Sequence, residues 1–220
     1  MLIAGIDDAG RGPIIGPLVI AGVLLDDKDV NLLKSLGVKD SKQLSPQRRE
    51  QLAQEIKGIV IKYHVERLSP AEIDRVVETG RKLHRLNRLE AHTMAKVIEA
   101  LRPDVAYIDA SDVLADRFGA HVSEKLTIKV KVISEHKADV TYPIVSSASI
   151  IAKVERDREI RELAQRFGDL GSGYVTDPKT VDFLERWLAQ HGSYPDFVRK
   201  SWRPARELRS DAQSRQSKLS

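Results

Sequence analysis

The order of the apolar runs along this sequence constrains the fold more than any other feature. Five short runs have the composition of strands: residues 2–7, 17–25, 59–68, 104–109 and 127–133. The later runs alternate with helix-like segments, and beyond residue 143 the pattern is helical only. Strands and helices that alternate in this way are typical of α/β proteins, in which helices cover a sheet. We therefore expect an α/β sheet domain at residues 1–170 and a helical region with a polar tail at 171–220.

Start signals place several of the helices. Ser45–Pro46 and Asp177–Pro178 each put a capping side chain before a proline at the first helical position. Ser69–Glu72 has the form of a capping box. We expect helices at residues 46–57, from 70 onward, 85–101, 113–125, 143–167 and 178–190. The tail from Arg203 is polar, and we expect it to fray.

Composition narrows the class of protein without identifying a partner. Lys and Arg number 36 against 32 Asp and Glu, and a net charge of +4 is weak evidence for a nucleic-acid partner. The chain has no cysteine, which excludes disulfides and thiolate metal sites. No apolar run approaches the ~20 residues of a membrane-spanning helix, and acidic residues interrupt the first run where a signal peptide would continue. We expect a soluble cytoplasmic protein without membrane attachment, and a monomer by default.

Aspartates end or follow the apolar runs. Asp7 and Asp8 close the first run, Asp109 closes the fourth, and Asp139 follows the fifth. Residues beyond the carboxyl ends of strands in an α/β sheet meet in one crevice, so these four carboxylates are expected to converge. Close carboxylates repel one another unless a cation lies between them, and oxygen ligands suit Mg²⁺ or Mn²⁺. The alternative, that each aspartate merely ends a strand, explains any one of them better than all four together.

The first two aspartates pose a geometric problem. Adjacent residues of a strand point to opposite faces, so Asp7 and Asp8 can share a site only if the chain already turns at Asp8. Gly10 favours such a turn. Gly10 and Gly12 let the backbone approach a ligand closely, and Arg11 can hold a phosphate with its planar guanidinium. Metal ligands beside such a turn predict phosphoryl-transfer chemistry, although a plain loop that needs glycine is the alternative.

The spacing of Gly5 and Gly10 also matches the start of a nucleotide-binding P-loop. That loop continues with Lys and then Ser or Thr, which reach the phosphates and the Mg²⁺. This chain has Arg11 and Gly12 there, and the two aspartates inside the loop would repel phosphate. We therefore set the nucleotide-hydrolase interpretation aside.

Taken together, these residues resemble ribonuclease HII, the type 2 ribonuclease H family, and in particular its archaeal branch. Six motifs carry the resemblance: Gly5–Pro13, Lys39–Lys42, Tyr107–Asp109, His136–Asp139, Ser146–Lys153 and Gly171–Tyr174. The resemblance implies a ribonuclease H-like fold with a mixed five-stranded sheet flanked by helices. It implies an endonuclease that hydrolyses the RNA strand of RNA/DNA hybrids and cuts 5′ of single ribonucleotides in duplex DNA, leaving 5′-phosphate ends.

The resemblance also assigns residues. It implies that four acids are catalytic and bind Mg²⁺ or Mn²⁺: Asp7, Asp8, Asp109 and Asp139. It implies that the turn Gly10, Arg11, Gly12 senses the ribose 2′-hydroxyl and that Tyr174 contacts the sugar. For Tyr174, packing in a small core beneath its loop is the alternative.

Four further residues are candidates to hold phosphates beside the cut: Lys42, Ser146, Ser149 and Lys153. Ser149 and Lys153 are four residues apart and share a helix face, although a solvated face explains them nearly as well. His136 could assist proton transfer, but ordering the loop that presents Asp139 is the favoured interpretation.

One residue departs from the family pattern, which usually has glutamate where this chain has Asp8. The shorter side chain loses one methylene of reach, so we expect reduced activity or a shifted preference for Mn²⁺. A non-catalytic or weakly active hybrid-binding protein is the alternative function. A third hypothesis is another enzyme of the same broad fold, such as a junction resolvase or transposase core.

The end of the sequence contains a weak partner signal. Gln216–Leu219 begins like the short Gln-x-x-Leu peptide that binds sliding clamps. The aromatic residues that should follow are missing, because the sequence stops at Ser220. Chance is the favoured interpretation, and a sliding clamp is a weak candidate partner.

Overall fold

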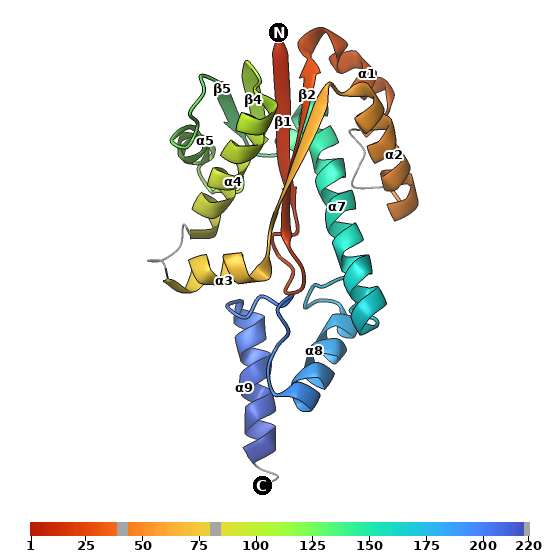
Figure 1. Cartoon of the computed structure of the whole chain (residues 1–220), viewed down its shortest axis with the longest axis vertical. Coiled ribbons are helices and arrows are strands. Elements are labelled where there is room, and N and C mark those ends of the chain that lie inside the picture. The colour runs from red at the N-terminus through yellow and green to blue at the C-terminus, as the bar shows by residue number, and fades with distance from the viewer. Residues whose placement is uncertain (39–43, 80–84, 218–220) are drawn as a thin grey trace. The chain divides into compact units, whose positions relative to one another are not determined.

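The computed structural model describes residues 1–38, 44–79 and 85–217, with side chains described as far as Asp211 (Figure 1). The chain forms two compact units. The first, here the sheet unit, comprises Met1–Ala9, Val19–Arg67 and Leu83–Glu155. The second, here the helical unit, comprises Gly10–Leu18, Leu68–Lys82 and Arg156–Ser220. Both are assembled from separate stretches of chain, and the expected division into domains at residues 1–170 and 171–220 stays a prediction.

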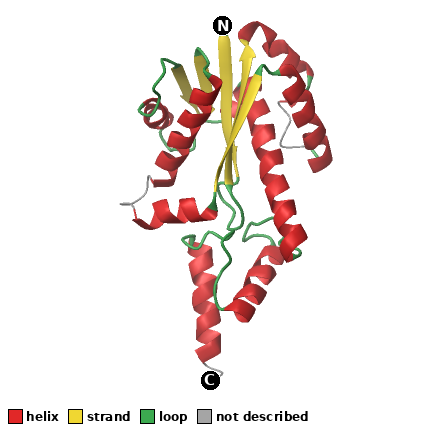
Figure 2. Ribbon diagram, in the orientation of Figure 1, coloured by secondary structure: helices red, strands yellow, loops and turns green. Residues whose placement is uncertain are grey.

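The described residues form a five-stranded sheet in the order β3-β2-β1-β4-β5. Figure 2 shows the strands in yellow among the helices in red. The strands are β1 (Leu2–Ala9), β2 (Leu18–Asp26), β3 (Lys62–Leu68), β4 (Val105–Asp109) and β5 (Lys131–Glu135). β1 pairs antiparallel with β2 and parallel with β4, and β4 pairs parallel with β5. The expected mixed five-stranded sheet is therefore confirmed.

Helices cover both faces of this sheet. The helices that lie wholly in the sheet unit are α1 (Val30–Ser35), α2 (Pro46–Ile59), α4 (Arg85–Leu101), α5 (Ala115–Ser123) and α6 (Ala138–Thr141), and α7 (Pro143–Phe167) begins there. A Cβ built on Gly5 of β1 would lie 2.3 Å from the backbone of Ile144 in α7. A Cβ built on Gly22 of β2 would lie 2.5 Å from the side chain of Val97 in α4. Gly22 pairs with Ile6, the neighbour of Gly5, so α7 and α4 contact opposite faces of the sheet, as Figure 1 shows.

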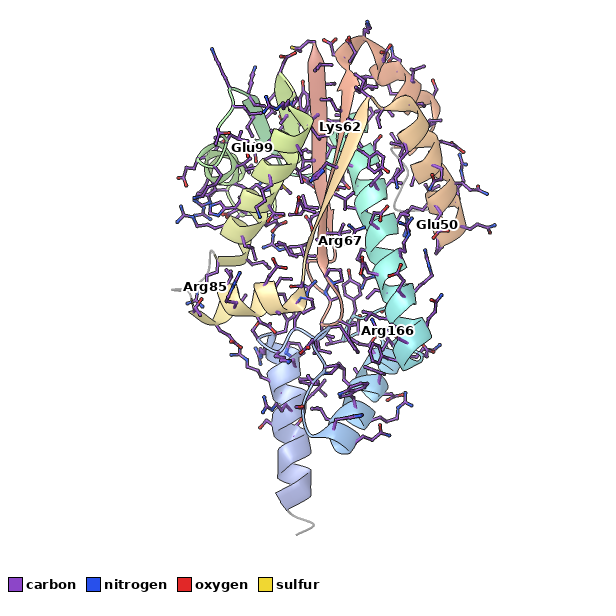
Figure 3. All side chains as sticks on the ribbon, in the orientation of Figure 1. Glu50, Lys62, Arg67, Arg85, Glu99 and Arg166 are labelled. Atoms are coloured by element: carbon purple, nitrogen blue, oxygen red, sulfur yellow. The ribbon has the colours of Figure 1, made fainter. Side chains whose placement is uncertain are left out.

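β3 is an edge strand and carries charged side chains at both ends (Figure 3). Lys62 donates to the carbonyl oxygen of Ala100 in α4 at 2.6 Å. Arg67 donates to the carboxylate of the buried Glu155 in α7 at 2.8 Å. Charged residues on an edge strand oppose pairing with another chain. The strand begins three residues later than expected, because Ile59 ends α2.

The helical unit has its own apolar core. Besides the end of α7 it contains α3 (Pro70–Thr79), α8 (Pro178–His191) and α9 (Arg203–Ser217). Its core includes the loop residues Ile14 and Ile15, which pack with residues of α7, α8 and the segment before α9. Ile15 also forms an isolated antiparallel bridge with Val198. This bridge fixes residues that directly follow the glycine turn, defined as Gly10–Gly12.

Most expected helix starts are confirmed. Ser45 caps α2 by accepting from the Arg48 N–H at 3.2 Å, and Asp177 caps α8 by accepting from the Lys179 N–H at 3.1 Å. The capping box forms at α3, where the Glu72 carboxylate accepts from the Ser69 N–H at 2.8 Å. None of the helices in the described part of the chain combines the length and apolar composition that crossing a bilayer requires.

Two expectations are wrong for physical reasons. β5 begins at Lys131 instead of residue 127, because its partner β4 begins at Val105, which pairs with Lys131. The tail from Arg203 forms α9 instead of fraying. Ala205 is fully buried in the core of the helical unit, and Leu208, three residues later, packs against that core. A narrow apolar stripe therefore stabilises a helix whose mean composition is polar.

Candidate metal centre and glycine turn

Three aspartates of the sheet unit converge, and we call them the acid cluster: Asp7, Asp109 and Asp139. Each offers one carboxylate oxygen, and these oxygens all lie within 4.8 Å of one another. Asp7 and Asp109 come together because they follow Ile6 and Ile108, which pair in the parallel strands β1 and β4. Asp139 enters from α6, the short helix that follows β5. The N–H of Ala138, next to Asp139, donates to Asp109 at 3.2 Å and ties α6 to the cluster.

The electrostatics of the acid cluster fit a divalent cation. Asp7 and Asp139 are buried, and Asp109 is partly exposed. Burial, and then the neighbouring carboxylates of Asp8 and Asp109, raise the pKa of Asp7 well above its usual range. A cation at the cluster would remove this penalty by stabilising the charged carboxylates. An oxygen-only donor set of this kind suits Mg²⁺ or Mn²⁺.

Asp8 does not join the acid cluster. β1 continues as a strand through Ala9, with Asp8 opposite Ile20, so the expected turn at Asp8 is wrong. The Asp8 carboxylate accepts from the Ser111 hydroxyl at 3.4 Å. The single hydrogen of this hydroxyl is shared with the closer carboxylate of Glu90, which is fully buried in α4. Strand alternation thus directs Asp7 toward the α7 face of the sheet and Asp8 toward the α4 face.

Of the expected phosphate-binding residues, Ser149 contacts the acid cluster and Lys153 contacts Ser149. The Ser149 hydroxyl hydrogen-bonds to Asp7, and the Lys153 ammonium donates to the Ser149 oxygen. Both residues lie on α7 four residues apart, as the helix-face interpretation requires. The ammonium therefore lies one hydroxyl away from the Asp7 carboxylate. Phosphate contact by either residue stays a prediction.

The other expected residues of this unit have different surroundings. Ser146 is fully buried, and its hydroxyl donates to the carbonyl oxygens of Asp139 and Tyr142, so it fixes the backbone that presents Asp139. His136 is exposed in the turn between β5 and α6. Lys42 lies outside the described residues.

In the helical unit, the glycine turn lies beside Tyr174. Gly10 has a φ of +88°, and a Cβ there would lie 2.6 Å from the carbonyl oxygen of Pro17, so only glycine fits. A Cβ on Gly12 would lie 3.5 Å from the ring of Tyr174. Tyr174 is 39% exposed, which argues against its interpretation as a core residue beneath its loop. The structure thus brings together two parts of the expected sugar-contacting surface that are 162 residues apart.

No motif or spacing in the sequence singles out Arg156, which holds this surface in place. Its guanidinium lies 5.3 Å from the centre of the Tyr174 ring and donates to the Ser172 carbonyl oxygen at 2.6 Å. An arginine over an aromatic face restricts the orientation of the ring. The sequence places Arg156 in an expected helix, but the same is true of many other charged residues, so this position does not distinguish it.

A mixed five-stranded sheet with carboxylates gathered at the ends of two parallel strands fits the ribonuclease H-like class. The family model of ribonuclease HII matches residues 4–205. The chain therefore belongs to the ribonuclease HII family, and it is an endoribonuclease. It is 45% identical to the ribonuclease HII of Pyrococcus furiosus, over 100% of this chain and 96% of that one. It is 47% identical to that of Methanosarcina mazei, over 96% of this chain and 98% of the relative.

Solved structures agree with this assignment. The ribonuclease H2 from Pyrococcus horikoshii is similar with a TM-score of 0.89 and 44% identity, covering 97% of this chain and 99% of that one. A second similar structure is the complex of PCNA with ribonuclease HII from Archaeoglobus fulgidus, with a TM-score of 0.84, 44% identity and coverages of 94% and 96%. The family and the fold expected from the sequence are confirmed.

Proposed function

We propose that the protein hydrolyses the RNA strand of RNA/DNA hybrids and cuts 5′ of single ribonucleotides in duplex DNA. The observation that carries the proposal is the convergence of Asp7, Asp109 and Asp139 in a chain of this family. We propose that these carboxylates hold Mg²⁺ or Mn²⁺. When bound, the metal would supply a Lewis acid that activates the attacking water and stabilises the leaving oxygen.

The residues around the acid cluster would prepare it for this task. The Asp8 N–H donates to the Asp7 carboxylate at 2.7 Å, and the Ser149 hydroxyl contacts the same carboxylate. These contacts fix the direction of Asp7 before a cation arrives. We infer that Asp8 acts on the centre through its charge or through water, because its side chain lies against Ser111. Lys153 is a candidate phosphate contact at the edge of the cluster, and Lys42 is proposed from the family resemblance alone.

Recognition of ribose would fall to the glycine turn and Tyr174. The 2′-hydroxyl is the group that distinguishes RNA from DNA at a given site. The absence of side chains at Gly10 and Gly12 allows the backbone to approach that hydroxyl, while Arg11 can hold a neighbouring phosphate. The exposed Tyr174 ring beside Gly12 can pack on the sugar.

A sliding clamp is proposed as a partner. The support is the solved complex of PCNA with the ribonuclease HII of Archaeoglobus fulgidus, a relative at 44% identity. The segment Gln216–Leu219 extends beyond the described residues, and chance similarity stays the favoured interpretation of it. A monomeric state and a cytoplasmic location also stay predictions, and we propose a role in DNA replication and repair.

The test is cleavage of three matched duplexes: an RNA/DNA hybrid, duplex DNA with one ribonucleotide, and all-DNA duplex. We expect cutting of the first two with 5′-phosphate products, in Mg²⁺ or Mn²⁺, and no cutting after chelation. Cutting that survives chelation would contradict metal catalysis, and cutting of the all-DNA duplex would favour a resolvase-like enzyme. Binding of the hybrid without cutting at any Mn²⁺ concentration would favour the hybrid-binding alternative.

The position of Asp8 gives a prediction about metal preference. We expect Asp8→Glu to raise the cleavage rate in Mg²⁺ by about tenfold, or about 1.4 kcal/mol, and to raise it less in Mn²⁺. The added methylene lets the carboxylate reach farther from β1, where the shorter aspartate contacts Ser111. Single-turnover cleavage of DNA with one ribonucleotide measures the effect in each metal. Asp116→Glu is the matched control, because Asp116 is an exposed residue on α5. Equal cleavage rates for the parent and Asp8→Glu in both metals would refute the expected loss of activity caused by the shorter Asp8 side chain.

A further inference from the structure

Arg199 is the largest side chain that is fully buried in the described part of the chain. A buried guanidinium is costly unless its donors are satisfied. Its Nη1 donates to the carbonyl oxygen of Arg11 at 2.7 Å, and its Nη2 donates to that of Gly10. Its Nε and Nη2 also donate to the carbonyl oxygen of Gly16, at 3.2 and 3.1 Å. One cation of the helical unit thus holds three carbonyl groups in and just after the glycine turn.

These contacts fix the direction in which the turn presents its N–H groups. In a trans peptide the carbonyl oxygen and the following N–H point in opposite directions. Since the carbonyls of Gly10 and Arg11 point at Arg199, the N–H groups of Arg11 and Gly12 point away from it. Hydrogen bonds from a cation to these carbonyls also polarise the peptide groups, which makes the two N–H groups stronger donors.

The carbonyl side of the turn is held by a second contact. The indole N–H of Trp202 lies 3.4 Å from the carbonyl oxygen of Gly12, and the Arg199 guanidinium lies 5.0 Å from the centre of the Trp202 ring. The carbonyls of all three residues of the turn therefore have contacts with Arg199 or Trp202. The other side of the turn carries the N–H groups of Arg11 and Gly12, which suit an oxygen acceptor such as the ribose 2′-oxygen.

The segment that carries Arg199 is itself anchored. The Arg199 N–H donates to the carbonyl oxygen of Ile14 at 2.9 Å. The buried Asp74 of α3 accepts from the N–H groups of Lys200 and Ser201, at 2.8 and 3.0 Å, and from the Ser201 hydroxyl at 2.6 Å. The guanidinium is therefore presented from a fixed backbone, as a positioning group requires.

We propose that Arg199 is a positioning residue that presents the N–H groups of the glycine turn to the ribose 2′-oxygen, and so contributes to the preference for ribonucleotides. This role rests on the proposed function of the turn. It predicts that Arg199 acts on the difference between ribose and deoxyribose, and that it leaves metal binding at the acid cluster unchanged.

The test is Arg199→Lys, which keeps the charge but offers one ammonium in place of the planar group that spans three carbonyls. Affinities are measured for duplex DNA with one ribonucleotide and for the all-DNA duplex, in Ca²⁺ under conditions in which the absence of cutting is verified. The ribose preference is the ratio of these two affinities. We expect it to fall by about tenfold, which corresponds to the loss of one or two hydrogen bonds, while the affinity for the all-DNA duplex stays unchanged. General damage to the fold would instead lower both affinities. Arg203→Lys is the matched control, because Arg203 is 84% exposed and pairs with Glu207 on α9.

A second variant covers the outcome in which Arg199→Lys does not fold. Trp202→Phe removes the indole N–H near Gly12 and keeps an aromatic ring, and we expect the preference to fall about threefold, the effect of one weaker contact. If the parent binds both duplexes equally, the proposed function of the turn fails and this role fails with it. If the parent discriminates and the folded variants discriminate equally well, only the role of Arg199 is overturned. Mn²⁺ titration of each variant should match the parent.

Discussion

Replacing Asp109 by Asn should lower cleavage of DNA containing one ribonucleotide by at least about a thousandfold, or about 4 kcal/mol of transition-state stabilisation. Asn has nearly the same shape, and its side-chain oxygen can still accept from the Ala138 N–H that bonds to Asp109. The substitution therefore removes a charge from the acid cluster while keeping α6 in place. The measurements are single-turnover rates in Mg²⁺ and Mn²⁺, together with Mn²⁺ affinity by calorimetry.

The same variant should gain stability in metal-free buffer. The pKa of Asp7 is raised by its burial and by the charges of Asp8 and Asp109, so the ionised cluster opposes folding near neutral pH. Removing one of these charges should raise Tm by about 2–4 °C, the shift that corresponds to roughly 1 kcal/mol in a chain of this size. Added Mn²⁺ should stabilise the parent more than the variant, because it binds the folded parent more tightly.

Asp116→Asn separates these effects from the loss of any acidic side chain. Asp116 is exposed on α5 in the same unit, and its replacement should change neither rate nor Mn²⁺ affinity. An Asp109→Asn variant that cuts within tenfold of the parent, with Mn²⁺ affinity retained, would remove Asp109 from the proposed centre.

The acid cluster could be anticipated from the sequence because strand ends are local features. Asp7 and Asp109 follow apolar runs that pair as parallel strands, and a parallel pair places the residues after its ends side by side. Asp139 was anticipated as well, although the short helix that presents it was not. The direction of the Asp8 side chain could not be anticipated, because it depends on the residue at which β1 ends. A shift of one residue in that end moves a side chain to the other face of the sheet.

The support of the glycine turn could not be anticipated in the same way. Arg199 lies 188 residues beyond the carbonyl of Arg11 that it holds, and no spacing rule connects them. An isolated arginine in a polar segment is ordinarily exposed, so its complete burial is a property of the tertiary fold alone. The helix α9 was missed for a related reason, since Ala205 contributes little to a hydropathy pattern but is fully buried.

Gly5 permits a close contact between β1 and α7. This contact explains how Ser149 of α7 meets Asp7 of β1. A Cβ at Gly5 would lie 2.3 Å from both the carbonyl carbon and the oxygen of Ile144, and 2.5 Å from the nitrogen of Val145. These are backbone atoms at the start of α7, so they cannot yield by a change of rotamer. Because α7 can approach β1 this closely, its Ser149 reaches Asp7.

Gly5→Ala should therefore destabilise the protein by about 3 kcal/mol or more, as overpacking against backbone does when neither element can move freely. The matched control is Gly58→Ala in α2, where a Cβ would meet nothing within 4 Å. That change should instead stabilise the protein by about 0.4–1 kcal/mol, because Gly58 lies in the last turn of α2 without a positive φ, and alanine there reduces the conformational freedom of the unfolded chain. Urea unfolding of both variants measures the difference.

Any folded Gly5→Ala protein should also bind Mn²⁺ more weakly, since moving α7 away from β1 separates Ser149 from Asp7. A Gly5→Ala variant as stable as the parent would show that α7 can shift without cost, and the acid cluster would then depend on the strands and α6 alone.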